Sequence, residues 1–218
     1  MLTGVNVRKL IDHTNLKPEA SGADILSLCA EAARWEFKAV CVNPAFIDLV
    51  VKQLRGTDVQ VCTVVGFPLG ATLIEVKVFE AQEAIKKGAN EIDMVINIGA
   101  LKAGNHSYIS NEIENVVKAS KGAPVKVIIE TCFLTDQEKR TACKLAAEAG
   151  AHFVKTSTGF GSSGANIEDV ALMKKVVGEK LGVKASGGIK DKETLKAMVA
   201  AGATRIGTSS GVKIMESW

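Results

Sequence analysis

The sequence lacks the features that mark several large classes of protein. Its 218 residues include no apolar run near the ~20 residues that a membrane-spanning helix requires. The net charge is only +3 and no basic run stands out, which disfavours a nucleic-acid or membrane surface but leaves small anionic substrates open. The first residues, Met1–Asn6, lack the apolar core of a signal peptide.

Paired cysteines and metal-ligand spacings are also missing. The five cysteines are an odd number without a C-x-x-C pair, so we expect reduced thiols and a cytoplasmic protein. His13, His106 and His152 show no metal-ligand spacing, so we expect neither a metal nor another cofactor.

Aromatic residues make up only 5% of a chain that is 47% apolar, and the apolar residues are mainly Ala, Val, Ile and Leu. Such a composition suits buried parallel strands covered by helices. Eight strand-like runs alternate with helix-like runs, near residues 10–14, 38–43, 59–65, 90–96, 125–130, 152–156, 183–186 and 203–207. We therefore predict an α/β fold, a single-domain (β/α)8 TIM barrel over residues 1–218 with a short N-terminal helical segment.

Helix-start signals support this interpretation. Predicted N-caps are Ser21, Asn43 before Pro44, Thr135, Asn166 or Asp169, and Asp191. One helix should bury a stripe of Ile74, Val78, Ala81 and Ile85.

Three segments repeat one pattern, in which a helix-ending glycine and an alanine lead into a strand: 88–93, 150–155 and 202–207. Their sixth positions are Asp93, Lys155 and Gly207. A repeated βα unit would hold these three residues at similar heights in the barrel.

Two lysines end apolar strands, Lys155 in the segment 153–159 and Lys184 one βα unit later. Active sites of such barrels lie at the carboxyl ends of the strands, so both should meet Asp93 there. Burial and a second ammonium both favour a neutral amine, which is a nucleophile toward carbonyls. The alternative is that each lysine is a structural ion-pair partner of Asp93 or Glu130.

Glycine-rich loops follow the last strands, where barrels often bind phosphate through backbone N–H groups and the start of a short helix. Tight-turn geometry is the alternative explanation. The candidate phosphate-binding residues are Thr158, Gly159, Ser186, Gly187, Gly188, Gly207, Ser209 and Ser210.

Other strand-end residues are candidates for lining the pocket: Asp12, Thr14, Cys41 and Thr131. Asp12 and Thr14 could equally tie down the first strand, and a buried strand cysteine is commonly inert. A reactive lysine beside a phosphate site indicates Schiff-base chemistry on a small phosphorylated carbonyl compound. Aldol cleavage, dehydration and isomerisation all remain open at this point.

Motifs in a fixed order along nearly the whole chain resemble those of the 2-deoxyribose-5-phosphate aldolase family. They are the segments 11–14, 16–18, 40–44, 65–70, 91–97, 126–131, 153–160 and 183–189. The resemblance implies a metal-free class I aldolase on a (β/α)8 barrel. That family cleaves 2-deoxy-D-ribose 5-phosphate reversibly to D-glyceraldehyde 3-phosphate and acetaldehyde, in deoxynucleoside breakdown.

The resemblance also implies roles for individual residues. Lys155 is similar to the Schiff-base lysine, and Lys184 to a second lysine that makes the first amine a weaker base. Asp93 matches a proton-relay acid that works through a bound water. Cys41 matches a pocket cysteine that aldehydes can trap. Members of the family associate, so we expect a homo-oligomer that acts on a small phosphorylated substrate, without nucleic acid or membrane.

Two departures from the family pattern carry expectations. The sequence ends at Trp218 without the terminal tyrosine that some members use in proton transfer, and its one tyrosine, Tyr108, is expected in a polar connection. Water and Asp93 would then carry the proton. Phe160 and Lys190 stand where some members have other cationic or bulky residues, which bears on phosphate affinity.

Two rival functions stay open. One is another lysine-dependent barrel aldolase that acts on a phosphorylated keto sugar. The other is a non-catalytic barrel that binds a sugar phosphate as a sensor, although a sensor has no use for a reactive amine.

Overall fold

The computed structural model describes residues 6–218, so most of the segment considered for a signal peptide lies outside the described residues. Eight parallel strands close into a barrel in which each strand pairs with the next and β8 pairs with β1. The strands are β1 Ile11–Asn15, β2 Ala39–Val42, β3 Gln60–Val65, β4 Glu91–Val95, β5 Val125–Ile128, β6 Phe153–Lys155, β7 Gly182–Ser186 and β8 Arg205–Thr208. All eight predicted strands are confirmed, and so is the barrel.

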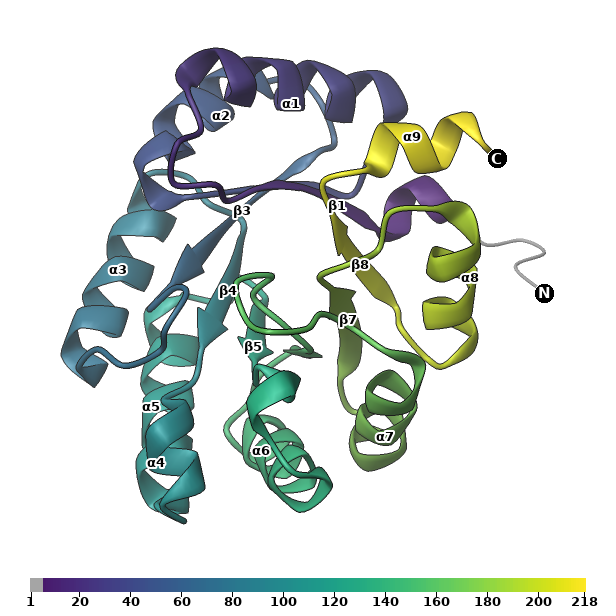
Figure 1. The fold of residues 1–218 in the computed structure, drawn as a ribbon. Coiled ribbons are helices and arrows are strands. Elements are labelled where there is room, and N and C mark those ends of the chain that lie inside the picture. The colour runs from purple at the N-terminus through teal and green to yellow at the C-terminus, as the bar shows by residue number, and fades with distance from the viewer. Residues whose placement is uncertain (1–5) are drawn as a thin grey trace.

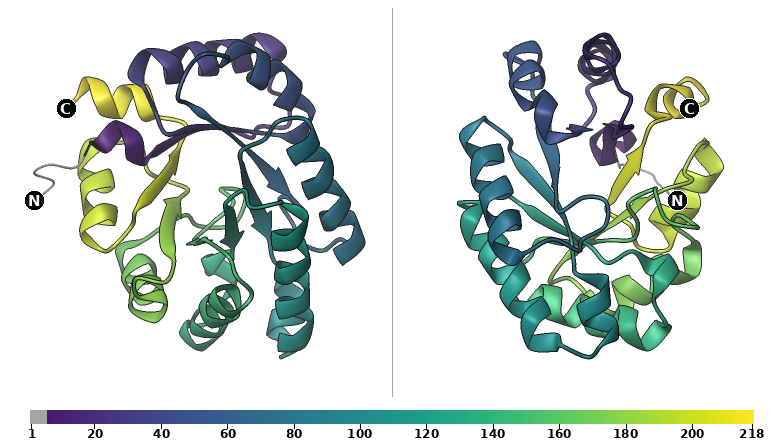
Figure 2. Two further views of the ribbon diagram at one scale, coloured as in Figure 1. Left: turned by 180° about the vertical axis from the view of Figure 1, so that it is seen from behind. Right: turned by 60° about the vertical axis from the view of Figure 1, so that its left-hand side comes forward.

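Helices surround this barrel as an outer ring (Figures 1 and 2). They are α1 Gly22–Trp35, α2 Ile47–Gln53, α3 Ile74–Lys86, α4 Ile98–Lys102, α5 His106–Ala119, α6 Asp136–Glu148, α7 Ile167–Val177, α8 Lys192–Ala200 and α9 Gly211–Glu216. Short 3-10 turns are η1 Val7–Leu10, η2 Pro44–Phe46 and η3 Thr131–Phe133. The expected N-terminal helical segment is therefore η1. Within residues 6–218, every helix is too short or too polar to cross a bilayer.

Side-chain caps begin several of these helices as the sequence predicts. Ser21 and Thr135 each form a capping box with the acidic residue three positions later, and Asn166 and Asp191 cap α7 and α8. Asn43 takes the predicted N-cap position before Pro44, at the start of η2, but its side chain forms no capping hydrogen bond. Its side-chain amide instead donates to the carbonyl of Leu16 at 3.2 Å, which ties the β1–α1 loop to the end of β2.

The connection after β4 also differs from its prediction. Tyr108 lies in the first turn of α5, not in a polar connection. The side chain of Asn105 accepts a hydrogen bond from the Tyr108 backbone at 3.2 Å, so a local cap begins a helix in a stretch that reads as polar.

Strand residues alternate between two environments. Those facing outward, such as Val40, Ile92 and Val183, pack against the helices in the main core. Those facing inward fill the barrel, where Cys41, Cys62 and their apolar neighbours form a smaller cluster and charged side chains fill the rest. Burying one large aliphatic side chain contributes about 1.5–3 kcal/mol, so the outward face supplies the stability that permits a polar interior.

The inward face of α3 carries one charged residue that the apolar stripe did not reveal. Ala81 is buried as predicted, but Lys77 is fully buried beside it. Its ammonium pairs with Glu112 of α5 and donates to the carbonyls of Gly70 at 2.7 Å and Val95 at 2.8 Å. This buried pair holds the β3–α3 loop against the end of β4.

Candidate active site

Three strands bring the predicted catalytic trio together. Lys155 ends β6 and is in register with Lys184 of β7. One carboxylate oxygen of Asp93, on β4, accepts from the Lys155 ammonium at 2.8 Å and from the Lys184 ammonium at 2.7 Å. The predicted convergence of these three residues is confirmed. Both lysines also form ion pairs with Asp93, which is the contact expected if they were purely structural. Glu130 pairs with neither, because it accepts hydrogen bonds from the backbone and hydroxyl of Thr158.

Further charged side chains, not singled out from the sequence, extend this cluster below the trio. Lys126 of β5 contacts Asp93 at 2.8 Å and Glu91 at 2.6 Å. Arg205 of β8 contacts Glu91 at 2.9 Å and Asp12 at 2.8 Å, and Asp12 also pairs with Lys184. These contacts close a cycle of alternating sign, which we call the ion-pair ring: Asp12, Lys184, Asp93, Lys126, Glu91 and Arg205.

The ring holds Asp93 and Lys184 in their charged forms. Burial alone would raise the pKa of Asp93, but Lys126, Lys155 and Lys184 outweigh burial and hold it well below its ordinary value. Burial likewise opposes the charge of Lys184, yet Asp12 and Asp93 raise its pKa above the ordinary value. Asp93 is therefore a carboxylate and Lys184 an ammonium at neutral pH.

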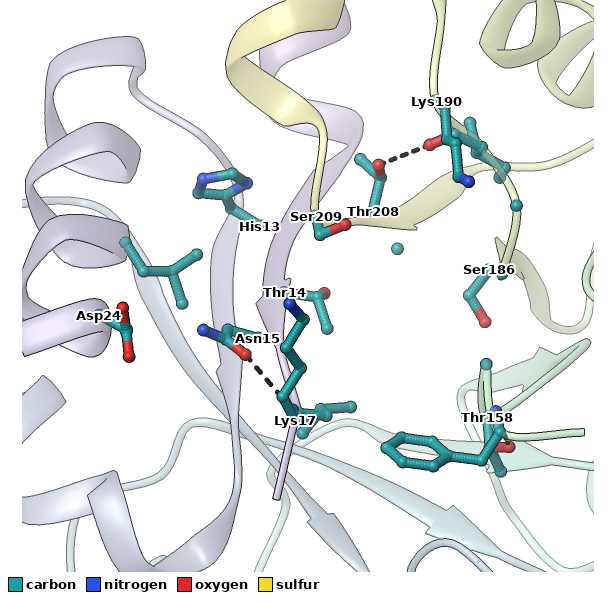
Figure 3. Close-up of a pocket in the computed structure, with 18 of the residues that line it drawn as sticks. His13, Thr14, Asn15, Lys17, Asp24, Thr158, Ser186, Lys190, Thr208 and Ser209 are labelled. Carbon is teal, nitrogen blue, oxygen red and sulfur yellow. Dashed lines mark hydrogen bonds between the residues drawn. The ribbon is translucent and has the colours of Figure 1, made fainter. Parts of the chain in front are cut away.

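A pocket of about 720 Å³ opens above the trio at the carboxyl ends of the strands (Figure 3). Of the trio, Lys155 lines it, whereas Asp93 and Lys184 have no exposed surface and lie beneath. The amine of Lys155 is thus the one group of the trio that a substrate can reach directly. Most of the predicted binding residues also line the pocket: Thr14, Thr158, Gly159, Ser186, Gly187, Gly188, Gly207 and Ser209.

The other predicted residues do not line this pocket. Asp12 belongs to the ion-pair ring, and Cys41 lies beside Cys62 inside the barrel. Thr131 is buried after β5 with an unpartnered hydroxyl. Ser210 precedes α9, and its backbone N–H donates to the Thr208 hydroxyl at 2.9 Å.

Glycine conformation opens one wall of the pocket. Gly187 and Gly188 have φ values of +87° and +80°, in the left-handed region that favours glycine. A side chain on Gly187 would meet the Cα of Gly164 at 2.9 Å, whereas Gly188 faces open space. This loop can therefore bring its backbone close to a ligand.

Two lysines that the sequence argument did not name as site residues reach into the pocket. Figure 3 shows Lys17, from the loop after β1, and Lys190, from the loop after β7, extending into it from different sides. Neither forms a salt bridge with a carboxylate among residues 6–218. For Lys17, the one signal in the sequence was its position in the family motif 16–18. In the structure, the amide of Asn43 binds the carbonyl of the preceding residue, Leu16, in the loop that carries Lys17.

Possible metal donors also occur inside the barrel. Cys41, Cys62 and Asp93 have ligand atoms within 4.8 Å of one another, as do Asp12, Cys62 and Glu91. Their carboxylates already bind Lys126, Lys184, Arg205 or Lys155, so a metal ion would have to displace a lysine or arginine. The donor set is therefore better matched to ammonium and guanidinium groups than to a metal.

Comparison with known proteins identifies the family to which this site corresponds. The model of the DeoC/LacD family aldolases matches residues 7–217. A deoxyribose-phosphate aldolase of Thermococcus gammatolerans is 60% identical over 99% of this chain and 97% of its own. One of Caldanaerobacter subterraneus is 60% identical over 98% of this chain and 94% of its own. The solved tetrameric deoxyribose phosphate aldolase of Aeropyrum pernix superposes with a TM-score of 0.91 at 35% identity, covering 97% of this chain and 90% of its own.

Proposed function

The chain belongs to the DeoC/LacD aldolase family, and from this premise we propose that it cleaves 2-deoxy-D-ribose 5-phosphate through a Schiff base on Lys155. The products would be D-glyceraldehyde 3-phosphate and acetaldehyde, and the reaction would be reversible. The observation that carries the proposal is that Lys155, alone of the buried lysine cluster, lines a pocket that several glycines and the two cations Lys17 and Lys190 also line. The relatives named deoxyribose-phosphate aldolase supply the substrate.

The proposed reaction begins when the neutral amine of Lys155 adds to the C1 aldehyde and water leaves. The resulting iminium draws electrons from the C2–C3 bond, which breaks as the C3 hydroxyl loses its proton. Glyceraldehyde 3-phosphate departs and an enamine remains on Lys155. Protonation at C2 and hydrolysis of the imine then release acetaldehyde and the free amine.

Asp93 is the proposed proton relay, through a water molecule. Lys126 and Lys184 stay charged beside Asp93 and hold it ionised, so it first acts as a base. The iminium on Lys155 adds a third positive charge beside Asp93, and this charge is lost when the neutral enamine forms. The proton affinity of Asp93 then rises when the C3 proton is released and C2 must receive one.

The phosphate is proposed to bind at the other end of the pocket. Backbone N–H groups of the loops around Gly188 and Ser209 would approach it, and Lys17 and Lys190 would neutralise its charge. Phe160 is half-exposed on the pocket wall. It would then lie beside the sugar and would not contact the phosphate. Cys41, with no exposed surface, would react with aldehyde only after local opening.

Borohydride trapping tests this function. The protein is incubated with deoxyribose 5-phosphate or with acetaldehyde, reduced, digested and mapped by mass spectrometry. We expect one adduct on Lys155 that is lost in Lys155→Ala and retained in Lys86→Ala, a control at an exposed lysine. Adducts scattered over surface lysines, or none, would reject the mechanism. Turnover with dihydroxyacetone phosphate or pyruvate as the donor in place of acetaldehyde would favour the rival aldolase, and binding without turnover would favour the sensor.

Four finer points are proposals of the same kind. We propose that the protein acts in deoxynucleoside breakdown as one domain, and that it assembles with copies of itself, since the Aeropyrum pernix relative is described as tetrameric. We also propose a reducing, cytoplasmic environment, because all five cysteines are free. Light scattering of the purified protein would test the assembly.

A further inference from the structure

The ion-pair ring has no net charge of its own. It contains the carboxylates of Asp12, Glu91 and Asp93 and the cations of Lys126, Lys184 and Arg205, and each member contacts at least two members of opposite sign. All six side chains are at least nine-tenths buried. A buried charge is costly unless it is paired, so a closed ring of equal numbers is a stable way to fill the barrel.

Lys155 is the seventh charged group, and it has no carboxylate of its own. Its ammonium contacts one oxygen of Asp93 at 2.8 Å, and that same oxygen already accepts from Lys184. Full protonation would leave one surplus positive charge in a region where Lys155 is 2% exposed. The three cations of the ring each contact at least two carboxylates, so Lys155 is the cation held by the fewest opposite charges.

We infer that the charge count of the ring, including its lower members Glu91 and Arg205, sets how readily Lys155 gives up its proton. Glu91 and Arg205 do not line the pocket and touch no substrate. They are positioning residues that act through charge. This inference rests on the proposed function only in taking Lys155 as the reacting amine.

Every strand contributes a group that faces this region. Besides the ring members and Lys155, β2 and β3 contribute Cys41 and Cys62. A hydrogen bond from Cys62 lowers the pKa of Cys41, while burial raises the pKa of Cys62 well above its ordinary value. The charged side chains that line the pocket above are Lys17, Asp24, Glu31 and Lys190. The test must therefore change the ring count while leaving these groups in place.

The inference predicts shifts of opposite sign for two neighbouring residues. Glu91→Gln removes a negative charge, which makes protonation of Lys155 harder and moves its half-protonation point to lower pH. Arg205→Gln removes a positive charge and moves that point to higher pH. At a separation of ~8 Å and an effective dielectric constant of ~20, each shift is about 1.5 pH units. The double variant Glu91→Gln/Arg205→Gln restores the zero net charge of the ring. The half-protonation point of Lys155 should therefore return to its value in the unmodified protein.

The measurement is competitive labelling with trace acetic anhydride across a pH series, with peptides quantified by mass spectrometry. It reports the neutral fraction of Lys155 without turnover. Lys86, whose side chain is 74% exposed, is the internal reference. Glu114→Gln and Arg8→Gln are matched controls at exposed positions outside the barrel, and should leave the Lys155 curve unmoved.

Opposite shifts for Glu91→Gln and Arg205→Gln, cancelled in the double variant, would support the inference. Shifts in one direction, or none, would overturn it and leave the ring a purely structural element. Lys126→Met also removes a ring cation, so it must move the half-protonation point of Lys155 to higher pH, as Arg205→Gln does. Each variant that folds therefore tests a stated direction of shift. Failure to cleave deoxyribose 5-phosphate would count against the proposed function alone, since labelling needs no turnover.

Discussion

Replacing Lys184 with methionine would measure how strongly the ion-pair ring stabilises the barrel. The ammonium of Lys184 contacts Asp12 and, at 2.7 Å, Asp93, and none of the three side chains has exposed surface. Methionine is similar to the lysine stem in length and flexibility, so lost packing is a small part of the effect. The main effect is electrostatic, because two buried carboxylates each lose a cation.

The magnitude follows from two arguments. Removing one partner of a buried ion pair costs ~3–5 kcal/mol, because the other charge stays buried. Burial raises the pKa of Asp12, but Lys184, Lys126 and Arg205 outweigh burial and lower it to about 2 from 3.8. That depression corresponds to roughly 2 kcal/mol of folding free energy, of which Lys184 supplies a part. We therefore expect Lys184→Met to lose about 3 kcal/mol of unfolding free energy at pH 7.

The sign of the pH dependence follows from the same numbers. The pKa of Asp12 is lower in the folded protein than in the unfolded chain, so its contribution is complete above 3.8 and is lost as the pH falls toward about 2. Removing Lys184 raises the folded pKa of Asp12. Acid destabilisation should therefore begin at a higher pH in Lys184→Met than in the unmodified protein.

Urea unfolding followed by far-ultraviolet circular dichroism, repeated from pH 7 down to pH 3, provides the assay. Lys86→Met makes the same chemical change at an exposed site and should alter stability by less than ~0.5 kcal/mol. Lys184→Met combined with Asp12→Asn should be more stable than Lys184→Met alone, since the buried carboxylate that lost the Lys184 ammonium is then replaced by a neutral amide. A loss below ~1 kcal/mol, or a double variant whose two losses simply add, would refute the reasoning.

Three further outcomes are expected. In steady-state kinetics, Lys17→Met and Lys190→Met should each raise KM for deoxyribose 5-phosphate several-fold, with little change in KM for unphosphorylated deoxyribose. Equal effects on both substrates would show that these lysines do not bind the phosphate. Gly164→Ala should destabilise the protein by about 1–3 kcal/mol in urea unfolding, because its new methyl group would overlap the backbone of Gly187; unchanged stability would mean that the loop moves freely. Thr135→Ala should cost about 1 kcal/mol through loss of the α6 capping box, with Thr135→Ser retaining most of the stability and thermal unfolding as the check.

Local chemistry accounts for what could be predicted without coordinates. The alternation of strands and helices could be predicted because apolar runs and helix caps act over only a few residues. The caps at Ser21 and Asp191 both form as predicted. The pairing of Lys155 with Asp93 was also accessible. Both residues end repeats of one βα unit, and parallel strands bring their carboxyl ends to one side.

The contacts that the sequence did not reveal also have physical causes. Asn43 reads as a cap, but a partner 27 positions earlier in the chain competes for its side chain. Lys77 lies in a helix where a lysine is ordinarily solvent-exposed, and only the packing of α3 against α5 brings Glu112 to it.

The eight βα units, the two strand lysines and the glycine loops could be predicted from the sequence, since each depends on residues close together in the chain. That Glu91, Lys126 and Arg205 join the site became apparent only from the folded barrel. In a strand, a charged residue that points into the barrel looks the same in sequence as one that faces solvent, and the barrel must close before β8 meets β1. Closure joins Arg205 to Asp12, 193 positions away, and so completes the ring beneath Lys155.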